Sequence, residues 1–86
     1  MSEAFRSIKE LARELRALTG GGREPTAIEL SDLQRRVQSS HALEVPHFLW
    51  HWLADADIRV KDSEYRRSQV AQLETVLQQM EGPHAT

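Results

Sequence analysis

The segment PHFLWHWLADAD, Pro46–Asp57, contains most of the aromatic residues of the chain. Pro46 suits the first position of a helix, because its fixed backbone angle is helical and its missing N–H is not needed there. At about 100° per residue, the apolar side chains cover about 240° of this helix; they are Phe48, Leu49, Trp50, Trp52, Leu53, Ala54 and Ala56. One neighbouring helix cannot cover so wide a surface. We therefore predict that this helix is the centre of a bundle or that part of it faces a partner.

The two tryptophans of this segment further indicate that more than one neighbour is needed to cover the helix. Residues two apart on a helix point about 160° away from each other, so one neighbouring helix cannot cover both Trp50 and Trp52. We assign partner binding to Phe48, Trp50 and Trp52. An exposed aromatic position among them is expected to become buried only in a complex.

Upstream, an amphipathic helix is expected over about residues 3–19. Ser2 can cap its start, and Gly20 is a suitable left-handed stop. Its apolar residues recur at steps of three and four, giving a stripe about 140° wide; they are Phe5, Ile8, Leu11, Ala12, Leu15 and Leu18.

A second helix is expected over residues 27–39. Thr26 and Glu29 have the spacing of a capping box, in which each side chain accepts a hydrogen bond from the backbone of the other residue. A loop over about 40–45 then leads to Pro46, because proline cannot lie inside a helix that continues through these residues.

The last helix is expected over residues 63–81, with Asp62 as its cap and Gly82 as its stop. Residues 83–86 are expected to fray. The apolar stripe predicted for this helix consists of Tyr65, Val70, Leu73, Val76, Leu77 and Met80.

Together these patterns predict an all-α, single-domain bundle of four helices over residues 1–86, with the helix at about 46–57 in the centre. The alternative is one continuous helix over 46–81, since no glycine or proline interrupts it. We favour four helices because the apolar face changes phase near Ile58.

Composition limits the classes of function. The chain has 86 residues, of which 40% are hydrophobic and 28% charged, and no cysteine, which excludes disulfides, zinc–thiolate sites and a cysteine nucleophile. A net charge of −2 does not favour nucleic acid or an anionic membrane. The first residues, 1–6, do not resemble a secretory signal, and no apolar run is long enough to cross a bilayer. We expect a cytoplasmic protein.

One constellation has the spacing of a metal site. His47, His51 and Asp55 follow one another at intervals of four, so they project from one side of a helix. Two imidazoles at this spacing can chelate zinc, with the carboxylate as a third ligand and His41 of the preceding loop as a further one. Phe48 stands where a metalloprotease helix has its glutamate, which excludes that reaction. The competing interpretation is that these residues form the solvated edge of a mostly buried helix.

DNA binding is a distant third hypothesis. The helices at 27–39 and 46–57 could be drawn as a helix-turn-helix. The second of them, however, offers no Arg, Lys, Asn or Gln to read base edges, and Asp55 and Asp57 near its end would face phosphate.

The sequence contains no combination of residues that we can assign to catalysis, and it implies no cofactor other than the zinc of the second hypothesis. We therefore expect a small, non-enzymatic protein that self-associates, as a homodimer, or docks on a larger protein partner. The metal-binding domain is the alternative, and no nucleic acid or membrane is expected as a partner.

Overall fold

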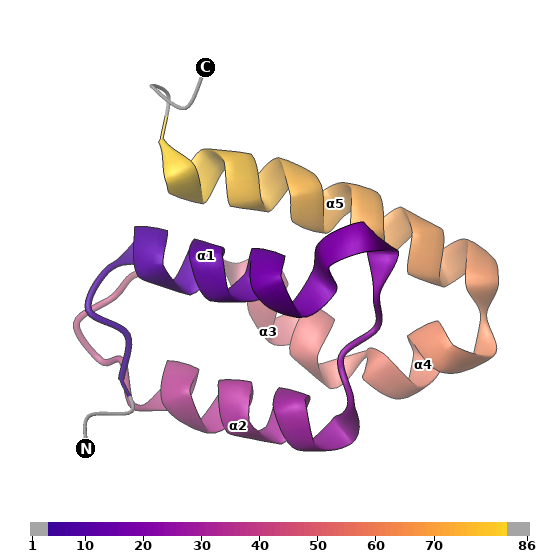
Figure 1. Cartoon of the computed structure of the whole chain (residues 1–86), viewed down its shortest axis with the longest axis horizontal. Helices are drawn as coiled ribbons and strands as arrows, with labels where there is room; N and C mark the ends of the chain where they lie inside the picture. The colour runs from indigo at the N-terminus through magenta and orange to yellow at the C-terminus, as the bar shows by residue number, and fades with distance from the viewer. Residues whose placement is uncertain (1–3, 83–86) are drawn as a thin grey trace. The chain divides into compact units, whose positions relative to one another are not determined.

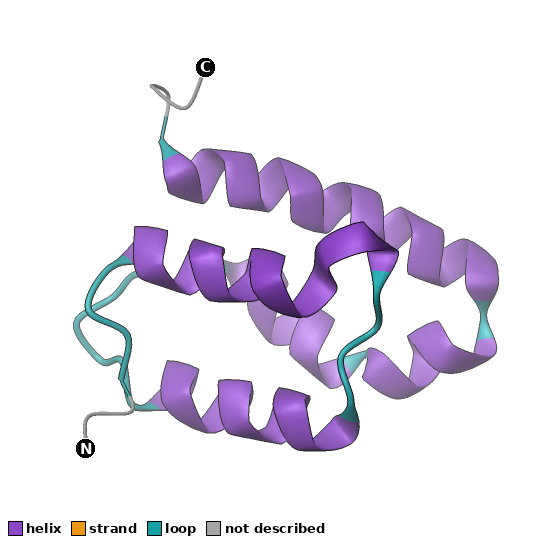
Figure 2. Cartoon of the chain, in the orientation of Figure 1, coloured by secondary structure: helices purple, strands orange, loops and turns teal. Residues whose placement is uncertain are grey.

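The structure is a computed structural model that describes residues 4–82. Its elements are α-helices and one short 3-10 turn, and no strand occurs in the described range, which confirms the all-α class (Figures 1 and 2). In chain order they are α1 (Ile8–Thr19), η1 (Gly20–Gly22), α2 (Ala27–Gln38), α3 (His47–Ala54), α4 (Ala56–Lys61) and α5 (Ser63–Glu81). Within residues 4–82, no helix is both long and apolar enough to span a membrane.

The chain divides into two compact units, with the boundary between Val45 and Pro46. The first unit holds α1 and α2, and the second holds α3, α4 and α5. A single domain over 1–86 and a bundle centred on the third helix both stay predictions.

In the first unit, α1 begins later than expected. Ser7 rather than Ser2 caps it, because the Ser7 hydroxyl accepts a hydrogen bond from the backbone N–H of Glu10 at 3.1 Å; Ser2 lies outside the described residues. The predicted stripe is correct along the helix itself, where Leu11, Ala12 and Leu15 are buried.

Phe5 lies before α1 instead of within it, yet it is buried. Its backbone N–H donates to the hydroxyl of Ser40 at 2.8 Å, and the guanidinium of Arg36 lies 4.2 Å from the centre of its ring. The Ser40 hydroxyl in turn donates to the carbonyl of Arg36 at 2.7 Å. These contacts join the segment before α1 to the end of α2.

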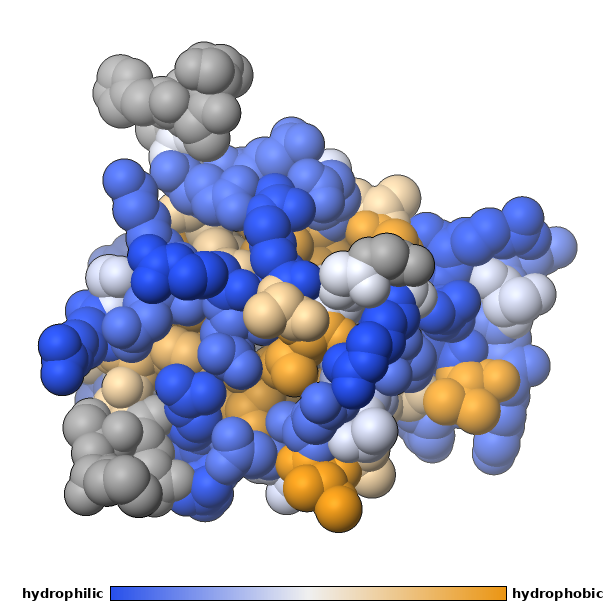
Figure 3. Space-filling model, in the orientation of Figure 1, coloured by the Kyte–Doolittle hydropathy of each residue, from blue (hydrophilic) through white to orange (hydrophobic). Residues whose placement is uncertain are grey.

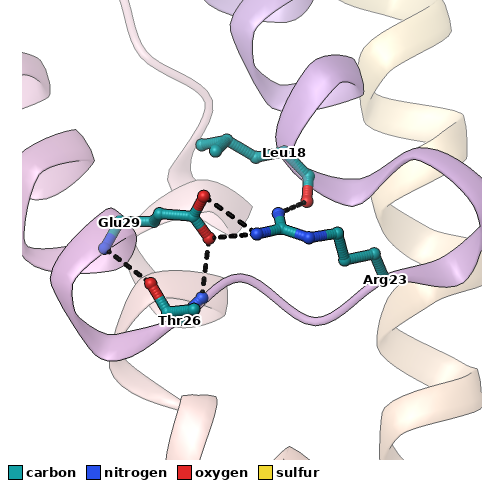
Figure 4. A network of polar contacts seen from close by, with 4 residues as sticks. All are labelled: Leu18, Arg23, Thr26 and Glu29. Carbon is teal, nitrogen blue, oxygen red and sulfur yellow. Dashed lines mark hydrogen bonds and ion pairs between the residues drawn. The ribbon is translucent and has the colours of Figure 1, made fainter.

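The turn between α1 and α2 is stabilised by polar contacts (Figure 4). Gly22 rather than Gly20 adopts the left-handed conformation, with φ of 80°. The predicted capping box is confirmed: the Thr26 hydroxyl accepts from Glu29, and the Glu29 carboxylate accepts from Thr26 at 2.8 Å. The Arg23 guanidinium pairs with the same carboxylate at 2.7 Å. The backbone N–H of Thr26 and this guanidinium lower the pKa of Glu29.

In the second unit, the segment predicted as one helix over 46–57 is divided. Asp55 has φ of −96° and ψ of 13°, and it separates α3 from α4, a short helix where the sequence predicted a break. Backbone hydrogen bonds still continue through this residue, from Asp55 to His51 and from Arg59 to Asp55. The chain then turns at Asp62, and α5 runs antiparallel to α3 and α4 (Figure 1).

The limits of α5 agree with the prediction, and Asp62 caps it by accepting from the backbone of residues 64 and 65. The inward stripe differs at one position. Val70 is exposed and Gln69 takes the buried place ahead of Leu73, Leu77 and Met80. The continuous helix over 46–81 is wrong, because Asp62 has an extended backbone. Residues 83–86, expected to fray, lie outside the described range.

Replacement of Thr26 by alanine tests the capping box. Thr26→Ala removes the acceptor at the start of α2 and is expected to lower the free energy of unfolding by about 1 kcal/mol in urea denaturation. Thr75→Ala is the matched control, because its exposed hydroxyl bonds only within α5; its effect should stay within about 0.5 kcal/mol. Equal losses in both variants would contradict the role of Thr26.

Candidate functional site

The two histidines of the predicted metal site are close together on the surface of α3. The Nε2 atoms of His47 and His51 lie 3.0 Å apart, and their ring centres are 4.7 Å apart with the planes at 76°. Both residues are exposed. At this separation one ring can donate a hydrogen bond to the other.

Asp55, the third predicted ligand, is occupied elsewhere. Its Oδ2 atom accepts hydrogen bonds from the hydroxyl of Tyr65 at 2.5 Å and from the side-chain amide of Gln69 at 3.1 Å. Both donors belong to α5. In residues 4–82, no group of three or more histidine, aspartate and glutamate side chains is placed to hold a metal ion. This arrangement gives no support to a three-ligand site made of His47, His51 and Asp55. His41, the further ligand that the sequence suggested, belongs to the first unit, whereas these three residues belong to the second.

The predicted partner-binding residues differ in accessibility. Trp52 is buried, with 2% of its surface exposed, whereas Trp50 keeps 37% of its surface exposed. Phe48 is half-buried. Trp50 is therefore the accessible tryptophan in this conformation, and the assignment of partner binding to these residues stays a prediction.

A buried polar network connects the helices of the second unit. The guanidinium of Arg59, 1% exposed, donates to the backbone carbonyl of Trp52 and to the side-chain oxygen of Gln69, the latter at 2.7 Å. It also lies 4.5 Å from the centre of the Trp52 ring. Gln69 continues the network to Asp55 and to the hydroxyl of Tyr65 at 3.3 Å.

This network explains the break between α3 and α4. The last carbonyl groups of a helix lack partners within it. In α3, the carbonyl of Trp52 is satisfied by the side chain of Arg59, and a positive charge is favourable at this end of the helix dipole. The short helix α4 thus places its one buried residue against the end of α3.

Sequence reasoning missed Arg59, Gln69 and Tyr65 as members of one cluster. An available signal was the spacing of seven between Trp52 and Arg59, which places both on the same side of a continued helix. A charged residue at that position resembles a solvent-facing one, and its burial depends on acceptors supplied by another helix.

The Asp55 carboxylate determines the acid–base behaviour of Tyr65. Because the tyrosine hydroxyl donates to this carboxylate, loss of its proton would remove the hydrogen bond and place two negative charges together. The pKa of Tyr65 is therefore raised above 10.0, with partial desolvation adding to the effect.

Comparison of the chain with protein families, with curated proteins and with solved structures found no match.

Removal of the buried guanidinium tests its structural role. Arg59→Met leaves the Trp52 carbonyl and the Gln69 oxygen without their donor, and we expect the free energy of unfolding to fall by about 2 to 4 kcal/mol. Urea denaturation followed by circular dichroism measures this loss.

Arg67→Met is the matched control, because Arg67 is exposed on α5; its effect should stay within about 0.5 kcal/mol. In addition, Gln69→Leu should cost less in the Arg59→Met background than in the wild type, because the shared hydrogen bond is already lost. Independent, additive effects of the two substitutions would contradict the network.

The titration of Tyr65 provides a separate test. The chain has one tyrosine, so tyrosinate absorbance near 295 nm follows this residue alone. In the folded protein we expect a midpoint above pH 10, and Asp55→Asn should return it toward 10 because the carboxylate charge is removed. Since the pKa is raised on folding, the hydrogen bond stabilises the protein below pH 10 and this contribution is lost as pH rises through the folded-state pKa. A wild-type midpoint at or below 10 would contradict the contact.

Proposed function

We propose that the chain is a small, non-enzymatic interaction protein that binds a second copy of itself through the outer face of α3 and α4, defined as Trp50, Asp57, Val60 and Lys61. The observation that carries the proposal is that apolar side chains are exposed there. Trp50 keeps 37% of its surface exposed to solvent, and Val60 keeps 74%. Apolar groups left in water favour association, because their burial is favourable in proportion to area.

The outer face is continuous across the junction of the two helices. Trp52 and Arg59 are seven residues apart, and their contact shows that the helical phase is kept through Asp55. Trp50 and Asp57 have the same spacing of seven on the opposite side. On the face of the molecule shown in Figure 3, some apolar side chains lie at the surface among mostly polar ones.

The expected energetics suit a modest interface. Burial of one valine side chain is worth about 1.5 to 3 kcal/mol, and tryptophan is among the residues that contribute most at protein interfaces. A specific interface buries about 800 Å² on each partner. Trp50 and Val60 would form its apolar centre, with the charged residues at its rim.

The charges on this face favour a second copy as the partner. Asp57 and Lys61 are exposed one turn apart and have opposite signs. A two-fold interface makes reciprocal contacts, so two antiparallel α4 helices would place Asp57 of each copy near Lys61 of the other. Two ion pairs would result, and the net charge of −2 adds little repulsion.

The non-enzymatic part of the proposal is supported by the polar network of the second unit. Arg59, Gln69, Asp55 and Tyr65 direct donors and acceptors at one another, across distances of 2.5 to 3.3 Å for the contacts among the last three. Side chains that hydrogen-bond to one another in this way hold the helices together, and this gives the network a structural role.

Replacement of Val60 tests the interface. Val60→Gln places an amide where apolar contact is proposed, and we expect the dimer to dissociate at least about tenfold more readily in sedimentation equilibrium. Ile28→Gln is the matched control, because Ile28 is a similarly exposed aliphatic residue on α2, in the first unit. It should leave association unchanged.

Charge exchange then tests the antiparallel geometry. Asp57→Lys alone should weaken the dimer, because the introduced lysine of each copy would face Lys61 of the other copy. The double variant Asp57→Lys with Lys61→Asp should restore the dimer. A wild-type chain that stays monomeric up to about 1 mM would overturn the proposal of a second copy. Association that is indifferent to both Val60 and Ile28 would overturn this face as the contact.

A further inference from the structure

We propose that His47 and His51 form a two-ligand chelate for one divalent late transition-metal ion, of the kind exemplified by Ni²⁺ and Cu²⁺. The two Nε2 atoms are 3.0 Å apart on consecutive turns of α3. Neutral imidazole nitrogen is a preferred ligand for these ions. This inference is independent of self-association.

The distance between the nitrogens selects the coordination geometry. An ion held at about 2.1 Å from each nitrogen, a usual metal–imidazole distance, would see the pair at an angle of about 90°. This angle joins neighbouring positions of a tetragonal complex, the geometry typical of Cu²⁺ and Ni²⁺. Tetrahedral Zn²⁺ would need the nitrogens about 3.4 Å apart, so the rings would have to separate first.

The site is accessible and its scaffold is fixed. Both imidazoles are exposed, so an ion can reach them without opening the protein. The helix that carries them is anchored by buried Leu49 and Trp52 on the other side. Because the helix holds the two ligands on adjacent turns, binding to the second follows binding to the first at a high effective concentration.

The ligand set has two protein members. Asp55, one turn beyond His51, accepts hydrogen bonds from Tyr65 and Gln69 through Oδ2. The remaining positions on the ion would be filled by water. An open coordination sphere of this kind binds metal less tightly than a closed site with four protein ligands.

Isothermal titration of the full chain with NiCl₂ tests the inference, with MgCl₂ as a control ion because magnesium prefers oxygen ligands. We expect one Ni²⁺ per chain in the wild type. His47→Gln and His51→Gln should each weaken binding by at least about tenfold, because either substitution removes the second point of attachment. His41→Gln, which alters an exposed histidine of the first unit, should leave the affinity unchanged.

A second measurement does not depend on binding heat. Ligands that bind the folded state raise its melting temperature in proportion to the logarithm of concentration. Addition of NiCl₂ should therefore raise the Tm of the wild type and of His41→Gln, but not that of His47→Gln or His51→Gln. The inference would be overturned by equal Ni²⁺ affinity in the wild type and His51→Gln, or by one ion per two chains. Unchanged helical circular dichroism in each variant shows that any loss belongs to the site.

Discussion

The second unit depends on one buried cation, the guanidinium of Arg59. Taking such a charge out of water is costly unless it is hydrogen-bonded throughout. Here the cost is offset by the Trp52 carbonyl, by the face of the Trp52 ring and by the side chain of Gln69. These groups come from α3 and α5, while the cation comes from α4, so one interaction ties the positions of all three helices together.

The two proposed sites follow from this constraint. Because Trp52 is held inward, Trp50 must point away from it, and with Val60 it remains in water as the apolar part of the outer face. His47 and His51 lie between the inward and outward sides of α3. Both rings are exposed there, and their Nε2 atoms are 3.0 Å apart. A polar interaction in the interior therefore determines which chemistry α3 presents to solvent.

The first unit is held together by similar contacts. An arginine again lies over an aromatic ring, Arg36 over Phe5, and a side-chain hydroxyl, that of Ser40, again satisfies a backbone group. Short chains bury little apolar surface, so such contacts contribute a large share of what holds each unit together. In both units the aromatic residue and the arginine come from different segments, and their contact closes the unit.

The sequence determined the features that depend on neighbours within about one turn of helix. The capping box at Thr26, the cap at Asp62 and the amphipathic stripe of α1 could be predicted because their partners lie within about four residues. Tertiary structure decided the rest. Phe5 pairs with a residue 35 positions away, and Asp55 leaves the histidines for α5, 10 and 14 positions away. Arg59 is buried for the same reason: its environment is made by another helix, and no local periodicity specifies which distant acceptor will meet a charged side chain.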